Sequence, residues 1–458
     1  MFVMSDEIGD DEEELNDLDD EIPSGDEDDQ EMELTSDEYV ERISSGSYDD
    51  YDENTGEQDS PQSPVPDDSI LTFPAHSMPV FSCSLHPHNE LCATGGEDDK
   101  VFVWSRNTGQ ILYEFTEHKD TVIDVHFNRD GTYLATADLA GDIVLHKLQK
   151  MSSEPDKDGG NLVFHKVWEY SMGDMPWMSF HPATNVLIAG SEDGEIYFWR
   201  FPAGDCKILP GPGARCDSGD ISADGKKFVA SYNNGTVRLW DLRECTTIME
   251  IDENNSMVHS GGCTMVAHDK ASPFFMSGDL AGKIVFSTHS GPVGAIETGD
   301  VIEGMAFSPS TDIRMAATGT LSGQISIWDS SKCSLRLNCE PVGKNDGITE
   351  MRWISDYTLV VATVNGNIFG YDARTGVRIF KLSGHTAAIY SFCYDHRDSI
   401  LLSVSEDYSA KNVSESSFKI TSVSGFNCSS VTQFANVKTI LYVFGAISFV
   451  ISKSQNKI

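Results

Sequence analysis

The sequence has few basic side chains for its length. Its 458 residues include 32 Lys and Arg against 73 Asp and Glu, a formal net charge of −41. Residues 1–68 hold 28 of the acidic residues and one basic residue, Arg42, so this segment carries −27 and the other 390 residues carry −14. Such a surface repels nucleic-acid phosphates and anionic lipid headgroups, and it attracts basic proteins. We therefore expect a basic protein segment as the partner, with no direct nucleic-acid contact and no membrane contact.

The sequence also lacks paired cysteines and long apolar runs. Its ten cysteines are scattered without a Cys-x-x-Cys pair, which argues against a disulfide framework or a zinc site and favours reduced thiols inside the cell. The N-terminus has no basic region followed by an apolar core, so no secretory signal is expected. The longest apolar run, residues 440–451, is shorter than the ~20 residues that span a bilayer. We expect a monomer in the cytoplasm, with the nucleus left open as a second location.

Motifs of common enzyme classes are absent as well. The chain contains no Gly-x-Ser-x-Gly, no His-Glu-x-x-His and no Gly-x-x-x-x-Gly-Lys-Ser/Thr motif. Its histidines fall mostly at the starts of repeated units and in strands, where a structural role is expected. The sequence therefore predicts a protein without enzymatic activity, without a cofactor and without a metal site.

Composition divides the chain into three parts. Residues 1–68 combine Asp/Glu clusters with Ser, Gly and Pro and have few apolar groups, so a disordered tail is predicted. This tail either keeps the protein soluble or tethers a basic client. Residues 69–413 form the repeat region. The repeat pattern stops after Lys411, and residues 414–458 are predicted to be an atypical extension, either lineage-specific or, as we favour, an artefact such as translated intron sequence.

A repeated unit organises the middle part. Each unit has apolar strands, a tight turn with Asp or Asn and Gly, and a third strand with an aromatic end. Seven such ends follow one another at spacings of 41 to 46 residues, with one of 53 across the polar insertion 152–160: Trp104, His146, Trp199, Trp240, Phe286, Trp328 and Tyr371. An eighth unit begins at Gly384-His385. This period is typical of WD-repeat propeller blades.

The period predicts an all-β fold, a WD40 β-propeller. A lone four-stranded sheet cannot bury both of its faces, whereas blades stacked in a ring can. The count favours eight blades, and seven blades with an irregular cap are the alternative. Because an unpaired edge invites aggregation, the ring must close. Residues 69–73 are well placed to add the outer strand to blade eight.

Several side chains of the repeat are expected to be structural rather than catalytic. The Asp of the tight turn can reach the His at the start of its unit, which predicts the pairs His76–Asp98 and His385–Asp407. Further residues assigned structural roles are the turn acid and the strand-end aromatics of other blades: Asp193, Trp104, Trp199, Trp240 and Trp328.

Some stretches are more distinctive than a generic blade. These are Gly-Glu-Asp-Asp-Lys at 96–100, Gly-Asp-Met-Pro-Trp-Met at 173–178 and Gly-His-Thr-Ala at 384–387. With them, residues 70–411 resemble the angio-associated migratory cell protein family of WD-repeat proteins, and the acidic N-terminus is similar in character. Glu117 departs from the pattern, since Gly usually precedes the His.

The resemblance implies an adaptor without enzymatic activity. It also implies similarity to a fungal relative that serves as a dedicated chaperone in ribosome assembly. That relative grips the basic N-terminal segment of a newly made large-subunit ribosomal protein on its propeller face. Animal members are tied to cell migration and angiogenesis, so the alternative is a scaffold for signalling or ubiquitin-ligase components.

One rim of the propeller is the expected partner surface. Counting back from the strand ends, the residues before the turn position are Glu97, Leu139, Glu192, Asn233, Asp279, Leu321, Val364 and Glu406. Counting back from the inner strands adds Asp174, Asp217 and Glu303, offset by Arg215, while Trp177, Phe81 and Tyr390 could stack on arginine. The predicted partner-binding residues are thus Glu97, Asp174, Trp177, Glu192, Asp217, Asp279, Glu303 and Glu406. A solvated loop rim without a partner is the alternative.

Overall fold

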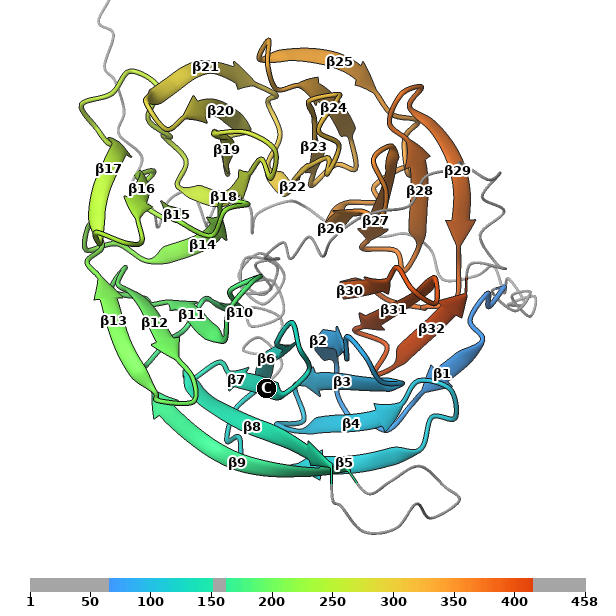
Figure 1. The fold of residues 1–458 in the computed structure, drawn as a ribbon. Coiled ribbons are helices and arrows are strands. Elements are labelled where there is room, and N and C mark those ends of the chain that lie inside the picture. Colours follow the sequence, from blue (N-terminus) through green and yellow to red (C-terminus); the bar gives the residue numbers. More distant parts are fainter. Residues whose placement is uncertain (1–65, 151–161, 415–458) are drawn as a thin grey trace, which may run out of the picture. The chain divides into compact units, whose positions relative to one another are not determined.

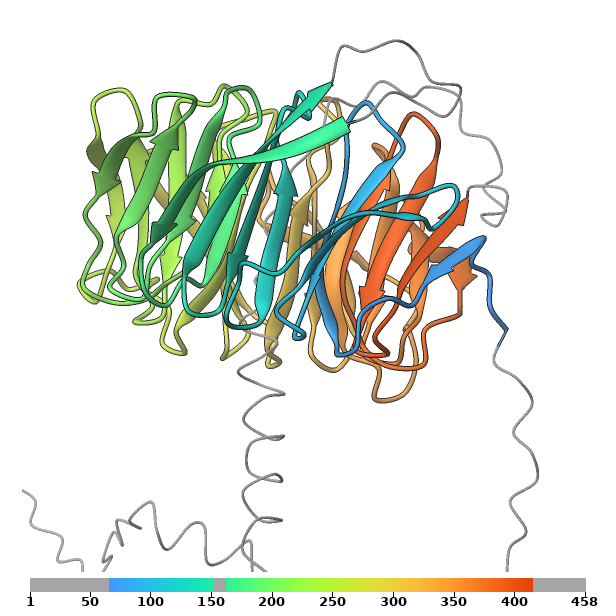
Figure 2. The ribbon, with the colours of Figure 1, turned by 90° about the horizontal axis from the view of Figure 1, so that it is seen from below.

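The computed structural model describes residues 66–150 and 162–414. In these two ranges the regular structure is β-strand throughout, and 32 strands form eight antiparallel sheets of four strands each. The sheets are arranged as blades in a ring, each with its first strand innermost (Figure 1). Seen from the side, the strands run between two rims that carry the loops (Figure 2). The prediction of an eight-bladed propeller is confirmed.

Each blade contributes four strands at equivalent depths. The innermost strands are β2 (Val80–Leu85), β6 (Val122–Phe127), β10 (Trp177–Phe180), β14 (Cys216–Ile221), β18 (Cys263–His268), β22 (Ile302–Phe307), β26 (Ile348–Trp353) and β30 (Ile389–Asp395). The second strands are β3 (Leu91–Gly96), β7 (Tyr133–Asp138), β11 (Val186–Gly190), β15 (Lys227–Tyr232), β19 (Phe274–Asp279), β23 (Met315–Thr320), β27 (Thr358–Thr363) and β31 (Ile400–Ser405).

The outermost strand of each blade is less buried than the other three. The third strands are β4 (Val101–Ser105), β8 (Asp142–Lys150), β12 (Ile196–Arg200), β16 (Val237–Asp241), β20 (Lys283–Thr288), β24 (Ile325–Asp329), β28 (Ile368–Asp372) and β32 (Ala410–Ser414). The outermost strands are β5 (Ile111–Phe115), β9 (Leu162–Ser171), β13 (Asp205–Leu209), β17 (Thr246–Ile251), β21 (Gly291–Glu297), β25 (Ser334–Asn338), β29 (Val377–Leu382) and β1 (Leu71–Phe73).

The ring closes through strand β1. Leu71 pairs with Asn412 and Phe73 with Ala410, so the first strand of the chain becomes the outer strand of blade eight, as the sequence predicted. Strand β32 runs on to Ser414, although the repeat pattern stops after Lys411. A strand needs backbone partners more than a particular side chain, and here the buried Val413 takes the place of the usual aromatic.

Side chains reinforce this closure seam between blades eight and one. Nζ of Lys411 lies 2.6 Å from Oδ2 of Asp67. Nη1 of Arg106 lies 2.7 Å from Oδ2 of Asp395, and both of these side chains are largely buried. The amide Nδ2 of Asn412 donates a 2.8 Å hydrogen bond to the carbonyl of Arg106. The seam is therefore held by contacts between the two ends of the described chain and not by covalent continuity.

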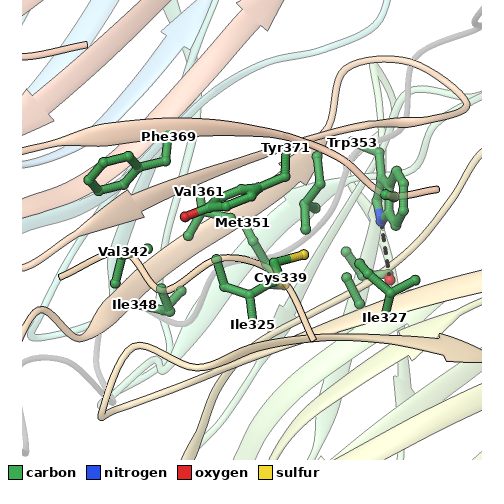
Figure 3. Close-up of a cluster of buried hydrophobic side chains, with 14 of the residues drawn as sticks. Ile325, Ile327, Cys339, Val342, Ile348, Met351, Trp353, Val361, Phe369 and Tyr371 are labelled. Atoms are coloured by element: carbon green, nitrogen blue, oxygen red, sulfur yellow. Dashed lines mark hydrogen bonds between the residues drawn. The ribbon is translucent and has the colours of Figure 1, made fainter. Parts of the chain in front are cut away.

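The hydrophobic core lies between neighbouring blades. Figure 3 shows one such layer between blades six and seven, where Ile325 and Ile327 of β24 face Met351 of β26 and Tyr371 of β28. In the same layer Trp353 is buried and its Nε1 donates to the carbonyl of Ala306, 3.3 Å away. Full burial of each large apolar side chain stabilises the fold by ~1.5–3 kcal/mol.

The predicted end of the third strand of blade five differs from the observed one by one residue. Ile284 of blade five pairs with Gly278 as Val101 of blade one pairs with Gly95. The residue three further on, equivalent to Trp104, is therefore Ser287 and not Phe286. Residues 284–287 are all buried. Because this strand is apolar on both faces, its sequence shows no alternation that sets the register. The sequence prediction therefore takes the nearest aromatic, Phe286, as the end of the strand.

Some predictions concern residues outside the described ranges. They include the disordered acidic tail up to residue 65, the polar insertion at 152–160 and the atypical extension from residue 415 onward. Within residues 66–150 and 162–414, no helix is long and apolar enough to cross a membrane.

Candidate protein-binding rim

Histidine–aspartate pairs hold the loops of blades one and eight. Nδ1 of His76 lies 2.9 Å from Oδ1 of Asp98, and its Nε2 lies 3.0 Å from Oγ1 of Thr94. His385 and Asp407 repeat this arrangement at 2.9 Å. Burial opposes the ionisation of Asp407, but the hydrogen bonds from His385, Ser409 and the backbone of Thr386, together with the charge of His385, outweigh it and lower the pKa of this carboxyl to about 2. The structure thus brings both predicted pairs together, in positions that fix loops.

In blades two and five the acid comes from another place in the chain. His118 is paired with Asp138 and His259 with Asp279, each at 3.1 Å. These acids stand at the end of the second strand, 20 residues after the histidine, whereas Asp98 follows its histidine by 22. Asp279 is fully buried. It was predicted to bind a partner on the rim, and this is corrected, because its carboxylate is enclosed and engaged with His259.

Of the other residues predicted to be structural, the four tryptophans are buried and Asp193 is not. Asp193 lies in the same turn position as Asp98 but is exposed, and blade three has Ser171 where blades one and eight have the histidine. The predicted loop-fixing role of Asp193 is therefore not supported by a histidine partner. The strand-end tryptophans are all buried, with 3% or less of each side chain exposed: Trp104, Trp199, Trp240 and Trp328.

One rim is defined by a hydrogen bond repeated in every blade. A turn residue donates its backbone N–H, over 2.8 to 3.4 Å, to a carbonyl that precedes the inner strand of the same blade. The acceptor is the residue just before that strand in seven blades, and in blade three it is Asp174, three residues before β10. The eight donors are Glu97, Leu139, Glu192, Asn233, Leu280, Leu321, Val364 and Glu406. We call this side the β3–β4 rim, after the first of these turns. Leu280, 42% exposed, holds the position that the sequence prediction gave to Asp279.

Two acidic side chains of this rim lie side by side at the closure seam. Glu97 and Glu406 are both exposed. Partial burial and the negative charges of Asp99 and Glu406 raise the pKa of Glu97. Beneath them, Phe81 and Tyr390 stack with ring centroids 4.7 Å apart, and burial followed by the charges of Glu406 and Glu97 raises the pKa of Tyr390. The seam thus presents two like charges near a buried aromatic pair.

A second acidic group lies between blades three and four. Asp174 and Glu192 are exposed, and the N–H of Glu192 donates to the carbonyl of Asp174. Asp217 is buried and accepts a 2.6 Å hydrogen bond from Nε of Arg215, which also lies 4.0 Å from Glu192. Arg215 therefore offsets part of this group, as the sequence suggested.

Glu303 stands at the start of the inner strand of blade six. It lies in a register shift between Ile302 and Gly304, the kind of bulge that turns a side chain away from the sheet. Only 8% of it is exposed, and its Oε1 has no hydrogen-bond partner among the described residues. Burial, followed by the charge of Asp300, raises the pKa of Glu303 to about 7.

Trp177 is not available to a partner. It is 1% exposed, its Nε1 donates a 3.0 Å hydrogen bond to the carbonyl of Cys216, and its ring packs against Phe228. Its predicted role in stacking on arginine is therefore corrected to a role in the core between blades three and four. The inner strand of blade three lacks the bulge that the other seven blades have. The sequence does not reveal this difference, so it could not distinguish Trp177 from an aromatic on the rim.

In the described residues no cluster of three or more His, Cys, Asp or Glu could hold a metal ion. The acids of the β3–β4 rim are spread over separate blades, so they offer a charged surface and not a compact coordination site.

Comparison with known proteins agrees with this architecture. Residues 67–105, 109–146, 177–200, 207–241 and 376–411 match the family described as WD domain, G-beta repeat. Angio-associated migratory cell protein of Homo sapiens is 33% identical over 366 residues, which cover 76% of this chain and 80% of that protein. Ribosome assembly protein SQT1 of Saccharomyces cerevisiae is 21% identical over 385 residues, covering 77% of this chain and 86% of that protein.

A solved structure shares the fold. Sqt1 of Chaetomium thermophilum, bound to the N-terminus of the ribosomal protein L10, gives a TM-score of 0.69 at 19% identity and covers 76% of this chain and 100% of that chain. From the repeats, the eight blades and the 33% identity over most of both chains, this chain belongs to the angio-associated migratory cell protein family of WD-repeat proteins.

Proposed function

We propose that this protein is a non-enzymatic chaperone or adaptor whose β3–β4 rim holds a Lys/Arg-rich segment of a newly made large-subunit ribosomal protein. The observation that carries the proposal is the pair of exposed carboxylates Glu97 and Glu406 at the closure seam. The charge of Glu406 contributes to the raised pKa of Glu97, and a cation bound beside the two carboxylates would relieve this repulsion. Phe81 and Tyr390 are 2% and 7% exposed and stack on each other, so they join the inner strands of blades one and eight and offer a partner little contact.

Charge and kinship support the same partner chemistry. After the correction of Asp279, three of the eight rim positions are acidic and none is basic. Asp174 adds a further exposed carboxylate beside Glu192. The Sqt1 structure named above contains the N-terminus of a ribosomal protein. Charge-assisted contacts to the rim contribute ~1.5–3 kcal/mol each where water is excluded, and much less where they stay exposed.

The direct test reverses the charge at the seam. In the double variant Glu97→Lys/Glu406→Lys, we expect affinity for a labelled Lys/Arg-rich peptide to fall at least tenfold, measured by fluorescence anisotropy. The matched control is Glu90→Lys/Glu244→Lys, two exposed residues in loops of the opposite rim. It changes the net charge by the same amount. Equal loss in both variants would mean that only overall charge matters, and unchanged binding in the seam variant would refute the proposal.

Affinity capture separates this function from a scaffold role. A stoichiometric ribosomal protein that dissociates at high salt supports the proposal, because the Debye length shortens to ~3 Å at 1 M salt. Recovery of ubiquitin-ligase or kinase components that survive high salt favours the scaffold instead. Purified tagged protein, captured at low and at high salt, gives either result directly.

A further inference from the structure

Two thiols meet at the closure seam. Sγ of Cys83 lies 3.7 Å from Sγ of Cys393, although the two residues are 310 positions apart in the chain. Cys83 belongs to β2 of blade one and Cys393 to β30 of blade eight. These are the inner strands of the two blades between which the ring closes. A disulfide needs the two sulfurs about 2 Å apart, and rotation about the side-chain bonds would bring them closer.

The two thiols have different surroundings. Cys83 is buried, its Sγ lies 3.7 Å from the carbonyl of Leu402, and burial raises its pKa well above the usual value. Cys393 is partly exposed. The guanidinium of Arg352 lies near Cys393 and 5.8 Å from the ring centroid of Phe392. Because Cys393 is the more exposed of the two thiols, an oxidant meets it first.

We propose that Cys83 and Cys393 form a disulfide under peroxide stress, and that this bond locks the propeller ring. In the first step the Cys393 thiol is oxidised by hydrogen peroxide to a sulfenic acid, and one water is released. In the second step the Cys83 sulfur attacks the Cys393 sulfur, the S–S bond forms and a second water leaves. The thiols lose two electrons in total and the peroxide gains them. The proposal does not depend on which partner binds the rim.

The physical consequence follows from where the bond falls. The seam is otherwise closed by the three-residue strand β1, by stacking and by ion pairs. A bond across 310 residues removes much of the freedom of the unfolded chain, and this stabilises the folded ring. It also ties together the strands that carry Phe81 and Tyr390.

The test uses the full chain, treated with hydrogen peroxide and then alkylated. Trypsin together with a glutamate-specific protease cuts after Glu90 and so separates Cys83 from its neighbour Cys92. We expect a peptide pair that joins Cys83 to Cys393, lost on reduction and in Cys393→Ser but kept in Cys92→Ser. We also expect oxidation to raise the melting temperature of the wild type by several degrees and to leave that of Cys393→Ser unchanged.

Two results would overturn the proposal. The first is a Cys393 that stays open to alkylation when the exposed Cys206 and Cys245 have been oxidised. The second is a linked peptide pair whose formation leaves the melting temperature unchanged or lowers it, since the bond then does not lock the ring. Cys393→Ser changes a partly exposed side chain, so we expect the variant to fold. Under reducing conditions its melting temperature should equal that of the wild type, and this measurement checks its folding.

Discussion

Nδ1 of His259 lies 3.1 Å from Oδ2 of Asp279, and both side chains are fully enclosed in blade five. The same kind of contact joins His76 and Asp98 in blade one, where the acid comes from the turn. A carboxylate can therefore reach the histidine either from the turn or from the end of the second strand. The histidine fixes the loop in both cases, and only the folded chain shows which acid serves it.

The first prediction concerns this buried pair. Asp279→Ala leaves His259 without its carboxylate partner in a site closed to water, so we expect the free energy of unfolding to fall by about 3 kcal/mol. Glu97→Gln changes an exposed rim carboxylate and should shift stability by less than about 0.5 kcal/mol. Urea denaturation of both variants measures the difference. Equal stability of the two would contradict the assignment of Asp279 to the core.

The second prediction concerns Glu303 and pH. Its pKa is raised from the ordinary 4.5 to about 7 in the folded protein. Between these pH values the folded state holds a proton that the unfolded chain has lost, so the free energy of unfolding falls as the pH rises through this range. Glu303→Gln removes this proton uptake. We expect the variant to gain melting temperature relative to the wild type between pH 4.5 and pH 8, and a difference that is independent of pH would contradict it.

The third prediction concerns Arg215, which offsets Asp217 and Glu192. Under the proposed function, Arg215→Gln exposes a basic peptide to more negative charge, and we expect about fivefold tighter binding with a steeper salt dependence. The buried Asp217 loses a partner, so the variant should also be less stable. Arg243→Gln, on an exposed loop between β16 and β17, is the control that should leave binding unchanged. Weaker binding in Arg215→Gln would mean that the arginine itself contacts the partner.

The fourth prediction concerns ring closure by β1. Phe73 is 2% exposed and stacks on Trp104 with centroids 4.4 Å apart. Phe73→Ala removes this contact and should cost about 3–5 kcal/mol of stability. An opened edge would also promote association, visible by size-exclusion chromatography. Ile70→Ala, at a residue 56% exposed, is the control and should behave as the wild type. If both variants are equally stable, β1 does not hold the ring.

The candidate site was harder to predict than the fold. Glu97 could be located by counting back from Trp104, which ends its strand, and Glu406 from the turn residue Asp407, because blade eight has Val413 in place of the aromatic. Blade five has Ser287 where the aromatic should stand, so the count shifted by one and selected Asp279. A one-residue shift along a strand exchanges a buried side chain for an exposed one. Asp217 and Glu303 were found by position, but their burial depends on neighbouring strands.

The repeat period by itself predicted the propeller and favoured eight blades over seven, and the shortage of basic side chains predicts a basic partner. These follow from local alternation and composition, which are properties of the chain alone. Tertiary structure decided what depends on distant segments coming together. It buried Trp177 against blade four and placed Cys83 beside Cys393 across 310 residues. Contacts between blades have no signature in the spacing of residues within one blade, so only the closed ring reveals them.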